Sequence, residues 1–357
     1  MLWMLAAILI CGASVFTACS SNDDNPFQPV VQVGIDKTNF PDDNFWNYLL
    51  EQDYGKDGVL TEAEIRNITV MDVSEKEIKS LKGIEYFTAL RTLNCIGNEL
   101  TELDISGNTT LDTLDCCYNE LTALDVSKNT ALRSLDCGFN ELTALDISKN
   151  TALTYLRCIG NSLTSLDLSK NTALTYLQCY GDDLTALDIS KNTALTVLHC
   201  GSNELTSLVL SVNKALTELS CDDNKLTSLD ISVNKALTEL SCSGNKLTSL
   251  DVSKNTALTY LYCGFNELTS LDLSKNMALN KLLCCNNQIS GQNMDALIGS
   301  LRQNESEEFC AFYVMDGNEP NQNVCTKSQA AAAKAKGWLP QYWDEDEKAW
   351  LEYEGSE

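Results

Sequence analysis

Residues 258–278 read LTYLYCGFNELTSLDLSKNMA, and the same pattern recurs every 21 residues from Leu90 onward. Nine such units follow one another, and a tenth begins at Leu279 but breaks off. The nine units begin at Leu90, Leu111, Leu132, Leu153, Leu174, Leu195, Leu216, Leu237 and Leu258. A unit this short cannot bury its own apolar face, so each must stack on its neighbours. The repeat therefore predicts one solenoid, although 357 residues would otherwise suggest two globular domains.

The unit resembles the leucine-rich repeat, which is about 20–29 residues long. Its first half carries the LxxLxCxxN pattern of that repeat, and its second half has the same spacing as LxxLxLxxN. Two such half-turns leave no room for a helix. We therefore expect a leucine-rich-repeat solenoid of stacked 21-residue coils, with a parallel β-sheet on the strand face and little helix in the repeats. A partial repeat over 68–89 precedes the nine units of 90–278, and 279–357 hold the last partial repeat and a C-terminal cap with helices and a strand.

Two columns of equivalent residues run through the units. An Asn, replaced by Asp182 in one unit, ends each first half, where its amide can bond backbone groups of adjacent coils. A Cys fills the last apolar slot before it, at Cys95, Cys116, Cys137, Cys158, Cys179, Cys200, Cys221, Cys242, Cys263 and Cys284. Because Val73 and Ile105 occupy equivalent slots, we interpret these cysteines as small buried hydrophobes with free thiols. Disulfides or metal ligation are the alternatives, and Cys310 with Cys325 is a further candidate pair.

The amino terminus predicts export. Residues 1–18 are an apolar run that ends in small residues, as in a signal peptide. Residues 16–19, FTAC, resemble a bacterial lipobox, which implies that Cys19 is the lipidated first residue of the mature protein. Residues 19–34 are polar and contain proline, which suits a tether. A plain secretory signal with an incidental cysteine is the alternative.

The units look like the cysteine-containing leucine-rich repeats of surface lipoproteins of Bacteroides-type bacteria, which are similar to internalin repeats. Asp23 and Asp24 match acidic stretches that accompany surface display in such lipoproteins. The resemblance covers nearly the whole mature chain. It implies a protein that is lipid-anchored in the outer membrane, faces outward, and binds a partner without catalysis.

Residues 35–67 predict a helix–loop–helix cap, with helices at about 42–51 and 62–67. The loop 53–64 fits a twelve-residue EF-hand pattern, with candidate calcium ligands at Asp53, Asp57, the Val59 carbonyl, Thr61 and Glu64. Gly55 stands where a ligand is usual, so we expect a structural calcium site with a dissociation constant near ~10⁻⁴–10⁻³ M. The alternative needs no metal, because T-x-x-E at 61–64 is also a capping box.

The C-terminal cap is predicted to hold a helix at 293–302, a strand at 308–315 and an alanine-rich helix at 328–336. Such a cap covers the open last coil of a solenoid. The end of the chain is rich in tryptophan, and Trp338, Trp343 and Trp350 either pack on the last coil, as we favour, or stack on a sugar.

Composition excludes several functions. Asp and Glu outnumber Lys and Arg by 50 to 25, and a net charge of −25 repels nucleic acids and anionic lipid surfaces. The chain has one histidine, His199, which argues against histidine-dependent hydrolysis and zinc chemistry. Glu218 and Glu239 could form a carboxylate pair for glycoside hydrolysis, but the open face of a solenoid offers no enclosing pocket. No cofactor is required.

The residues that differ between units predict the ligand site. They gather in and just after the expected strands, whereas the opposite half-turn is mostly Asp, Ser, Lys and Asn. Taking alternate side chains as outward, the candidate binding residues are Tyr118, Phe139, Tyr155, Arg157, Tyr176, Gln178, Tyr180, His199, Asp222, Asp223, Tyr260 and Tyr262. Aromatic rings beside polar groups suit a protein partner or a glycan. Cross-strand stacking that only stabilises the sheet is the alternative.

These observations predict a surface-anchored, non-catalytic module that recognises a protein partner through its strand face, in the manner of an adhesin. Glycan capture for nutrient uptake is the second hypothesis. A glycan-active enzyme and a purely structural envelope protein are less favoured. Contact with the membrane is expected only through the lipid anchor.

Overall fold

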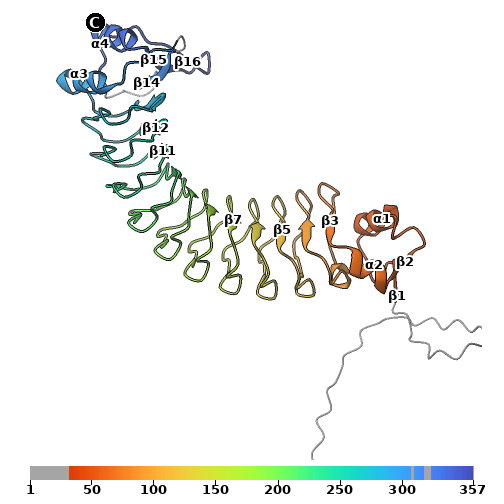
Figure 1. The fold of residues 1–357 in the computed structure, drawn as a ribbon. Coiled ribbons are helices and arrows are strands. Elements are labelled where there is room, and N and C mark those ends of the chain that lie inside the picture. Colours follow the sequence, from red (N-terminus) through yellow and green to blue (C-terminus); the bar gives the residue numbers. More distant parts are fainter. Residues whose placement is uncertain (1–31, 307–308, 317–322, 357) are drawn as a thin grey trace, which may run out of the picture.

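The computed structural model describes residues 32–306, 309–316 and 323–356. The predicted signal peptide and Cys19 lie outside the described residues. The coils stack side by side in a curved row with a cap at each end (Figure 1). No helix in the described ranges is long and apolar enough to cross a membrane.

The repeats form the predicted leucine-rich-repeat solenoid, with one short strand in each coil. A 14-stranded sheet runs from β3 to β16. In the repeats each strand residue pairs in parallel with the residue 21 positions later, as Leu156 does with Leu177. The strands of the repeat region are β3 (Val70–Asp72), β4 (Thr92–Asn94), β5 (Thr113–Asp115), β6 (Ser134–Asp136), β7 (Tyr155–Arg157), β8 (Tyr176–Gln178), β9 (Val197–His199), β10 (Glu218–Ser220), β11 (Glu239–Ser241), β12 (Tyr260–Tyr262) and β13 (Lys281–Leu283).

The leucines explain why each coil closes. The middle residue of a strand points inward, so Leu156 is fully buried between two half-buried neighbours. The second half of the same unit adds Leu163 and Leu168 to one continuous core. In the described repeats from Leu90 onward this second half contains no helix, as expected. Each coil therefore buries its apolar residues against the coils on both sides.

The predicted asparagine column joins neighbouring coils. Asn203 accepts a hydrogen bond from the Leu184 backbone nitrogen at 3.0 Å and donates to the Cys179 carbonyl at 2.8 Å, both in the preceding coil. A second column, which the sequence analysis did not single out, lies in the opposite half-turn. There Asn129 donates to the carbonyls of Ile105 and Asn108 at 3.0 and 2.9 Å.

Asp182 interrupts the first column. Its Oδ1 accepts from the Leu163 nitrogen at 3.2 Å, but an ionised carboxylate has no hydrogen for the carbonyls that an Asn would reach. Its Oδ2 is buried and has no partner among the described residues. Burial, the main cause, raises the pKa of Asp182 to about 6.

The cysteine column is buried throughout the described residues. Each of its members is a free thiol, as are Cys310 and Cys325, which form no disulfide. Burial raises the thiol pKa values, to about 12 for Cys200. The structure therefore agrees with the favoured interpretation of these positions as small buried hydrophobes.

The N-terminal cap contains β1 (Gln32–Gly34), α1 (Asp43–Glu51), β2 (Val59–Thr61) and α2 (Glu62–Asn67). A short 3₁₀ helix, η1 (Ile84–Tyr86), follows in the partial repeat. The tether predicted over 19–34 is too long, because residues 32–34 form β1 and pair antiparallel with β2, with Val33 buried. Asp42 is the N-cap of α1, and its Oδ2 also accepts from the backbone nitrogen of Lys79 at 2.8 Å. One carboxylate thus fixes the cap to the first coils.

The C-terminal cap extends the sheet. It contains α3 (Gly291–Ser300), β14 (Cys310–Asp316), α4 (Lys327–Ala335), β15 (Trp338–Asp344) and β16 (Ala349–Glu352). β14 pairs in parallel with β13, β15 with β14, and β16 antiparallel with β15. The sequence analysis expected one strand here and missed the last two. Trp338 is fully buried, and its indole nitrogen donates to the Arg302 carbonyl at 3.0 Å, so it packs in the cap.

Replacing Asp182 by Asn should stabilise the protein at neutral pH. A raised carboxyl pKa means that the folded state binds the proton more tightly, so the contribution of Asp182 to stability falls as pH rises from about 4 through about 6. We expect Asp182→Asn to raise the free energy of unfolding in urea by roughly 2 kcal/mol at pH 7.5, and by much less at pH 4.5. Glu141→Gln, at the equivalent exposed position two coils earlier, is the matched control and should change it by less than ~0.5 kcal/mol. A gain that does not depend on pH would contradict this account.

The thiols of the cysteine column should react only slowly with thiol reagents in the folded protein. Buried thiols with raised pKa values form little thiolate, so their reaction with Ellman's reagent should be about 100-fold slower than that of the unfolded chain. Urea should release all fourteen described thiols. Fewer thiols after unfolding without reductant would reveal disulfides. Cys11 and Cys19, outside the described residues, are replaced by Ser for this measurement.

Candidate binding face

The strand face is formed by the first and third residues of the strands β4 to β13. In Figure 1, β11 and β12 lie on the inner side of the curve. The register aligns equivalent residues of successive coils, so each outward side chain has neighbours 21 residues before and after it. The face therefore consists of parallel rows in which side chains contact across coils.

Tyr155 and Tyr176 occupy the first strand position in two adjacent coils. Their rings stack with centroids 4.6 Å apart and an interplanar angle of 10°. Tyr176 also lies 6.3 Å from the His199 ring, in a tilted arrangement. Both tyrosines are half-buried. The stacking that the sequence analysis offered as an alternative is therefore present, and it covers one face of each ring.

His199 lies in a polar chain across three coils. The Gln178 amide nitrogen is 2.7 Å from His199 Nδ1, and His199 Nε2 is 2.6 Å from a carboxylate oxygen of Glu218. If the amide donates to Nδ1, the imidazole carries its hydrogen on Nε2 and donates to Glu218. Both ring nitrogens are thus engaged, which fits a structural polar residue better than a catalyst. Glu218 also aligns with Glu239 in the next coil.

Arg157 is paired on the face rather than free. Its guanidinium donates to Asp136 at 2.8 Å and lies 5.4 Å from the centre of the Phe139 ring. The side chains of Arg157 and Asp136 are 20% and 12% exposed, so this ion pair is largely shielded from water. Arg157 therefore holds the face together and presents only part of its charge.

Asp115, Cys117 and Asp136 offer three ligand atoms within 4.8 Å of one another, the one such group among the described residues. Burial, and then the charge of Asp136, raises the pKa of Asp115. Burial also raises the pKa of Cys117, to about 12. The protonated thiol and the Arg157 charge beside Asp136 both disfavour a bound cation. The site fits a hydrogen-bonded cluster better than a metal centre.

Five predicted residues lie beyond the strands. Tyr118, Phe139 and Asp223 stand directly before the first asparagine column, with left-handed φ angles of 54°, 52° and 49°. Tyr180 and Asp222 stand one residue earlier. The assumed alternation was wrong for these positions, because each strand has only three residues and a turn follows.

The turn still brings these side chains to the edge of the strand face. The rings of Tyr118 and Phe139 stack at 4.4 Å, and Tyr118 is 53% exposed. Tyr180 is 39% exposed. Asp222 accepts from the Ser220 hydroxyl at 2.7 Å and from the Ser243 nitrogen at 2.8 Å, which restricts its side chain.

The last tyrosines form a separate group. Tyr260 is exposed at the first position of β12, and Tyr262 is half-buried at the third. The Lys281 ammonium lies 5.3 Å from the ring centres of both Tyr262 and Tyr313. This cation between two rings links the last regular coil to the C-terminal cap.

The predicted calcium loop is held by bonds that need no metal. Glu64 accepts from the Thr61 nitrogen at 2.8 Å and completes a capping box with it. Asp57 accepts from the Val59 nitrogen at 3.1 Å, and exposed Asp53 pairs with Lys56. The alternative capping role is therefore present, and calcium binding stays a prediction.

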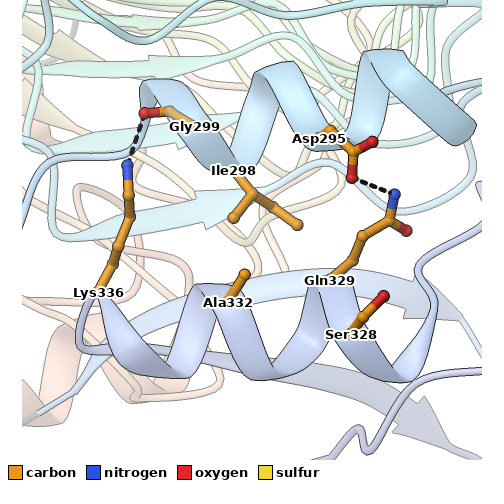
Figure 2. Close-up of a pocket in the computed structure, with 7 residues that line it drawn as sticks. All are labelled: Asp295, Ile298, Gly299, Ser328, Gln329, Ala332 and Lys336. Atoms are coloured by element: carbon orange, nitrogen blue, oxygen red, sulfur yellow. Dashed lines mark hydrogen bonds between the residues drawn. The ribbon is translucent and has the colours of Figure 1, made fainter.

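A cleft of about 310 Å³ lies between α3 and α4 in the C-terminal cap. Figure 2 shows that polar side chains bridge the two helices at both ends of it. Lys336 donates to the Gly299 carbonyl at 2.6 Å, and Gln329 donates to Asp295 at 2.8 Å. These polar groups are hydrogen-bonded to one another, so we assign them to helix packing rather than to a ligand site.

With this geometry described, the chain can be compared with known proteins. A model of the leucine-rich-repeat family, covering two copies of the repeat, matches residues 235–276. No curated protein sequence matches the chain. The fold and the repeat sequence together define a leucine-rich-repeat protein.

Solved structures add a more particular likeness. The functional domain of InlJ from Listeria monocytogenes, described as including a cysteine ladder, is 41% identical with a TM-score of 0.69. The match covers 73% of this chain and 58% of that domain, so the chain spans less than two thirds of it. The internalin InlF of the same species is 23% identical over 85% of this chain and 96% of its own, with a TM-score of 0.67. A leucine-rich-repeat protein of Leptospira interrogans is 23% identical over 73% of this chain and 68% of its own, with a TM-score of 0.63. These comparisons support an internalin-type leucine-rich-repeat protein.

The ion pair of the strand face should be important for stability. Replacing Arg157 by Gln leaves the buried Asp136 carboxylate without its cation, and we expect a loss of roughly 2 kcal/mol in the free energy of unfolding. Asp136→Asn in the same chain should recover part of that loss. Arg133→Gln removes an exposed arginine and serves as the control, with an expected change below ~0.5 kcal/mol. Equal effects of the two arginine substitutions would show that the pair contributes nothing.

Proposed function

We propose that this protein is a non-catalytic binding module that holds a protein partner on its strand face. The observation that carries the proposal is the division of residues within each coil. Inward positions repeat the same leucine, cysteine and asparagine, whereas the outward strand positions change along the solenoid, from Thr, Ser, Asn and Asp in β4 to β6 to Tyr, Arg, Gln, Val and His in β7 to β9. A surface on which only the outward residues vary fits recognition by many weak contacts and a few strong ones.

The shape of the molecule supports this proposal. Stacked repeats build long, curved surfaces that are widely used to bind other proteins. The comparisons agree, because the similar structures include internalins, and an internalin-like fold is consistent with a binding module. Exposed Tyr260 on the strand face and exposed Tyr180 at its edge offer rings suited to a protein interface.

A lipid anchor would place this module at a membrane surface. The proposal rests on the FTAC sequence at 16–19, in which Cys19 is the acceptor, and on the resemblance to surface lipoproteins. It includes an outward-facing position on the outer membrane. Labelling with radioactive palmitate, lost in Cys19→Ser, tests the anchor separately from partner binding.

Glycan capture is less supported than protein binding. Sugars bind aromatic rings through the ring face. Tyr155 and Tyr176 cover one face of each other, and so do Tyr118 and Phe139. The exposed rings of the repeats, those of Tyr118, Tyr180, Tyr260 and Phe265, lie on three separated coils rather than on one continuous platform.

Binding to arrays of host glycoproteins and free glycans tests the proposal. We expect binding to intact proteins that free oligosaccharides do not inhibit, and a loss of at least about tenfold in affinity for Tyr180→Ala with Tyr260→Ala. Met277→Ala is the control, because Met277 is 63% exposed but lies off the strand face. Circular dichroism checks that each variant is folded.

Two outcomes would overturn the proposal. Binding that free glycans abolish would favour carbohydrate capture. Protein binding that the tyrosine variant retains would show that the partner uses another surface.

A further inference from the structure

The half-turn opposite the strand face departs from its repeat in two consecutive coils. In the regular units this segment reads like residues 188–193, DISKNT. In the units that begin at Leu195 and Leu216, Val212 and Val233 replace the lysine, and Lys214 and Lys235 replace the threonine. The uniform opposite half-turn expected from the sequence is therefore interrupted. Both changes fall on residues that face away from the strand face.

These changes coincide with a groove of about 870 Å³. It is lined by Lys214, Ser232, Val233, Lys235, Ala236 and Lys254. Val233 is half-buried, while the three lysines are exposed. In the neighbouring coil Val209 and Val212 are 67% and 39% exposed, which is unusual in this otherwise polar half-turn. The groove thus combines apolar side chains with three cations.

The local charge of this region is opposite to that of the whole chain. The net charge of the protein is −25, but Val209 stands where the other units carry an aspartate, so in these half-turns Lys214, Lys235 and Lys254 outnumber Asp230 and Asp251. None of the three lysines forms an ion pair with a carboxylate of the described residues, whereas Lys225 on another edge pairs with Glu204. The ammonium groups of the groove are therefore available to an external anion.

We propose that this groove binds an extended acidic segment of a partner protein, with apolar side chains between its carboxylates. Lysine ammonium groups donate to carboxylates, and half-buried Val233 in the groove, with exposed Val209 and Val212 in the neighbouring coil, offers apolar contact. A short segment can enter the groove without approaching the acidic remainder of the surface. An anionic membrane cannot, because its flat and wide surface would be repelled by that remainder. This surface is separate from the strand face, and either can fail without the other.

A labelled peptide tests the groove directly. The probe is a fluorescein-labelled peptide of about twelve residues in which Glu alternates with Leu and Ser, and its binding to the purified protein is followed by anisotropy. We expect binding that weakens as salt rises to about 0.3 M, and that is at least about tenfold weaker for the triple variant Lys214→Glu, Lys235→Glu and Lys254→Glu. A control peptide with Lys in place of Glu should bind the triple variant no more weakly than it binds the unmodified protein.

The regular coils supply the matched control. The triple variant Lys149→Glu, Lys170→Glu and Lys191→Glu makes the same change of net charge on the same side of the solenoid and should bind the acidic peptide as the unmodified protein does. Equal losses in both triple variants, or no binding to the unmodified protein, would overturn the proposal. If the protein sediments with phosphatidylglycerol vesicles only when the groove lysines are intact, and does not bind the peptide, the groove binds a membrane instead.

Val233→Ser should weaken peptide binding without changing its dependence on salt. An unchanged affinity would remove the apolar part of the proposal.

Discussion

The hydrogen bonds from asparagine side chains to the preceding coil are what the rest of the structure depends on. A strand of three residues supplies few backbone bonds between coils, and the turns that follow it leave further backbone groups to be paired. Asn203 and its equivalents bond both a nitrogen and a carbonyl of the coil before them. The second asparagine column joins the opposite half-turns of neighbouring coils, as when Asn129 donates to two carbonyls. Together the columns let short strands form a long sheet.

This constraint also determines where the chain is able to vary. Positions that point inward must fill a fixed space between two coils, and the asparagine positions must reach fixed carbonyls. The outward positions face neither of these two constraints. In the coils of β10 and β11 the strand face carries Glu218 and Glu239, while the opposite half-turn carries Lys235 and Lys254 together with Asp230 and Asp251. The strand face of these coils is therefore acidic, whereas the opposite half-turn holds one carboxylate and one ammonium group in each coil.

Much of the fold followed from periodicity. The 21-residue spacing, the inward leucines and the first asparagine column predicted the solenoid, because a repeat that cannot bury itself has to stack. The ends were harder to predict. β1 pairs with β2 and β15 with β14, partners 25 or more residues away that no local pattern in residues 32–34 or 338–344 reveals. The β15–β16 hairpin is a local pair, which the aromatic residues of 338–350 could have indicated.

The sequence predicted the residues of the candidate site better than it predicted the contacts between them. Tyr155, Tyr176, Gln178 and His199 lie on the strand face as expected, but Tyr118 and Phe139 lie in the turn after it. Pairs such as Arg157 with Asp136 were missed, although residues 21 apart in register must be neighbours. That spacing was the available signal, and it identifies cross-coil partners once the strand positions are known.

The coils meet only their immediate neighbours, and this has a consequence for how such a chain can change over generations. Loss or duplication of one whole 21-residue unit leaves every remaining coil with the same kind of neighbour, while the distance between the caps changes by about 4.8 Å, the spacing of adjacent strands. Unequal recombination between nearly identical units can therefore lengthen or shorten the protein in steps. The length of the solenoid can therefore change independently of the side chains on its surface.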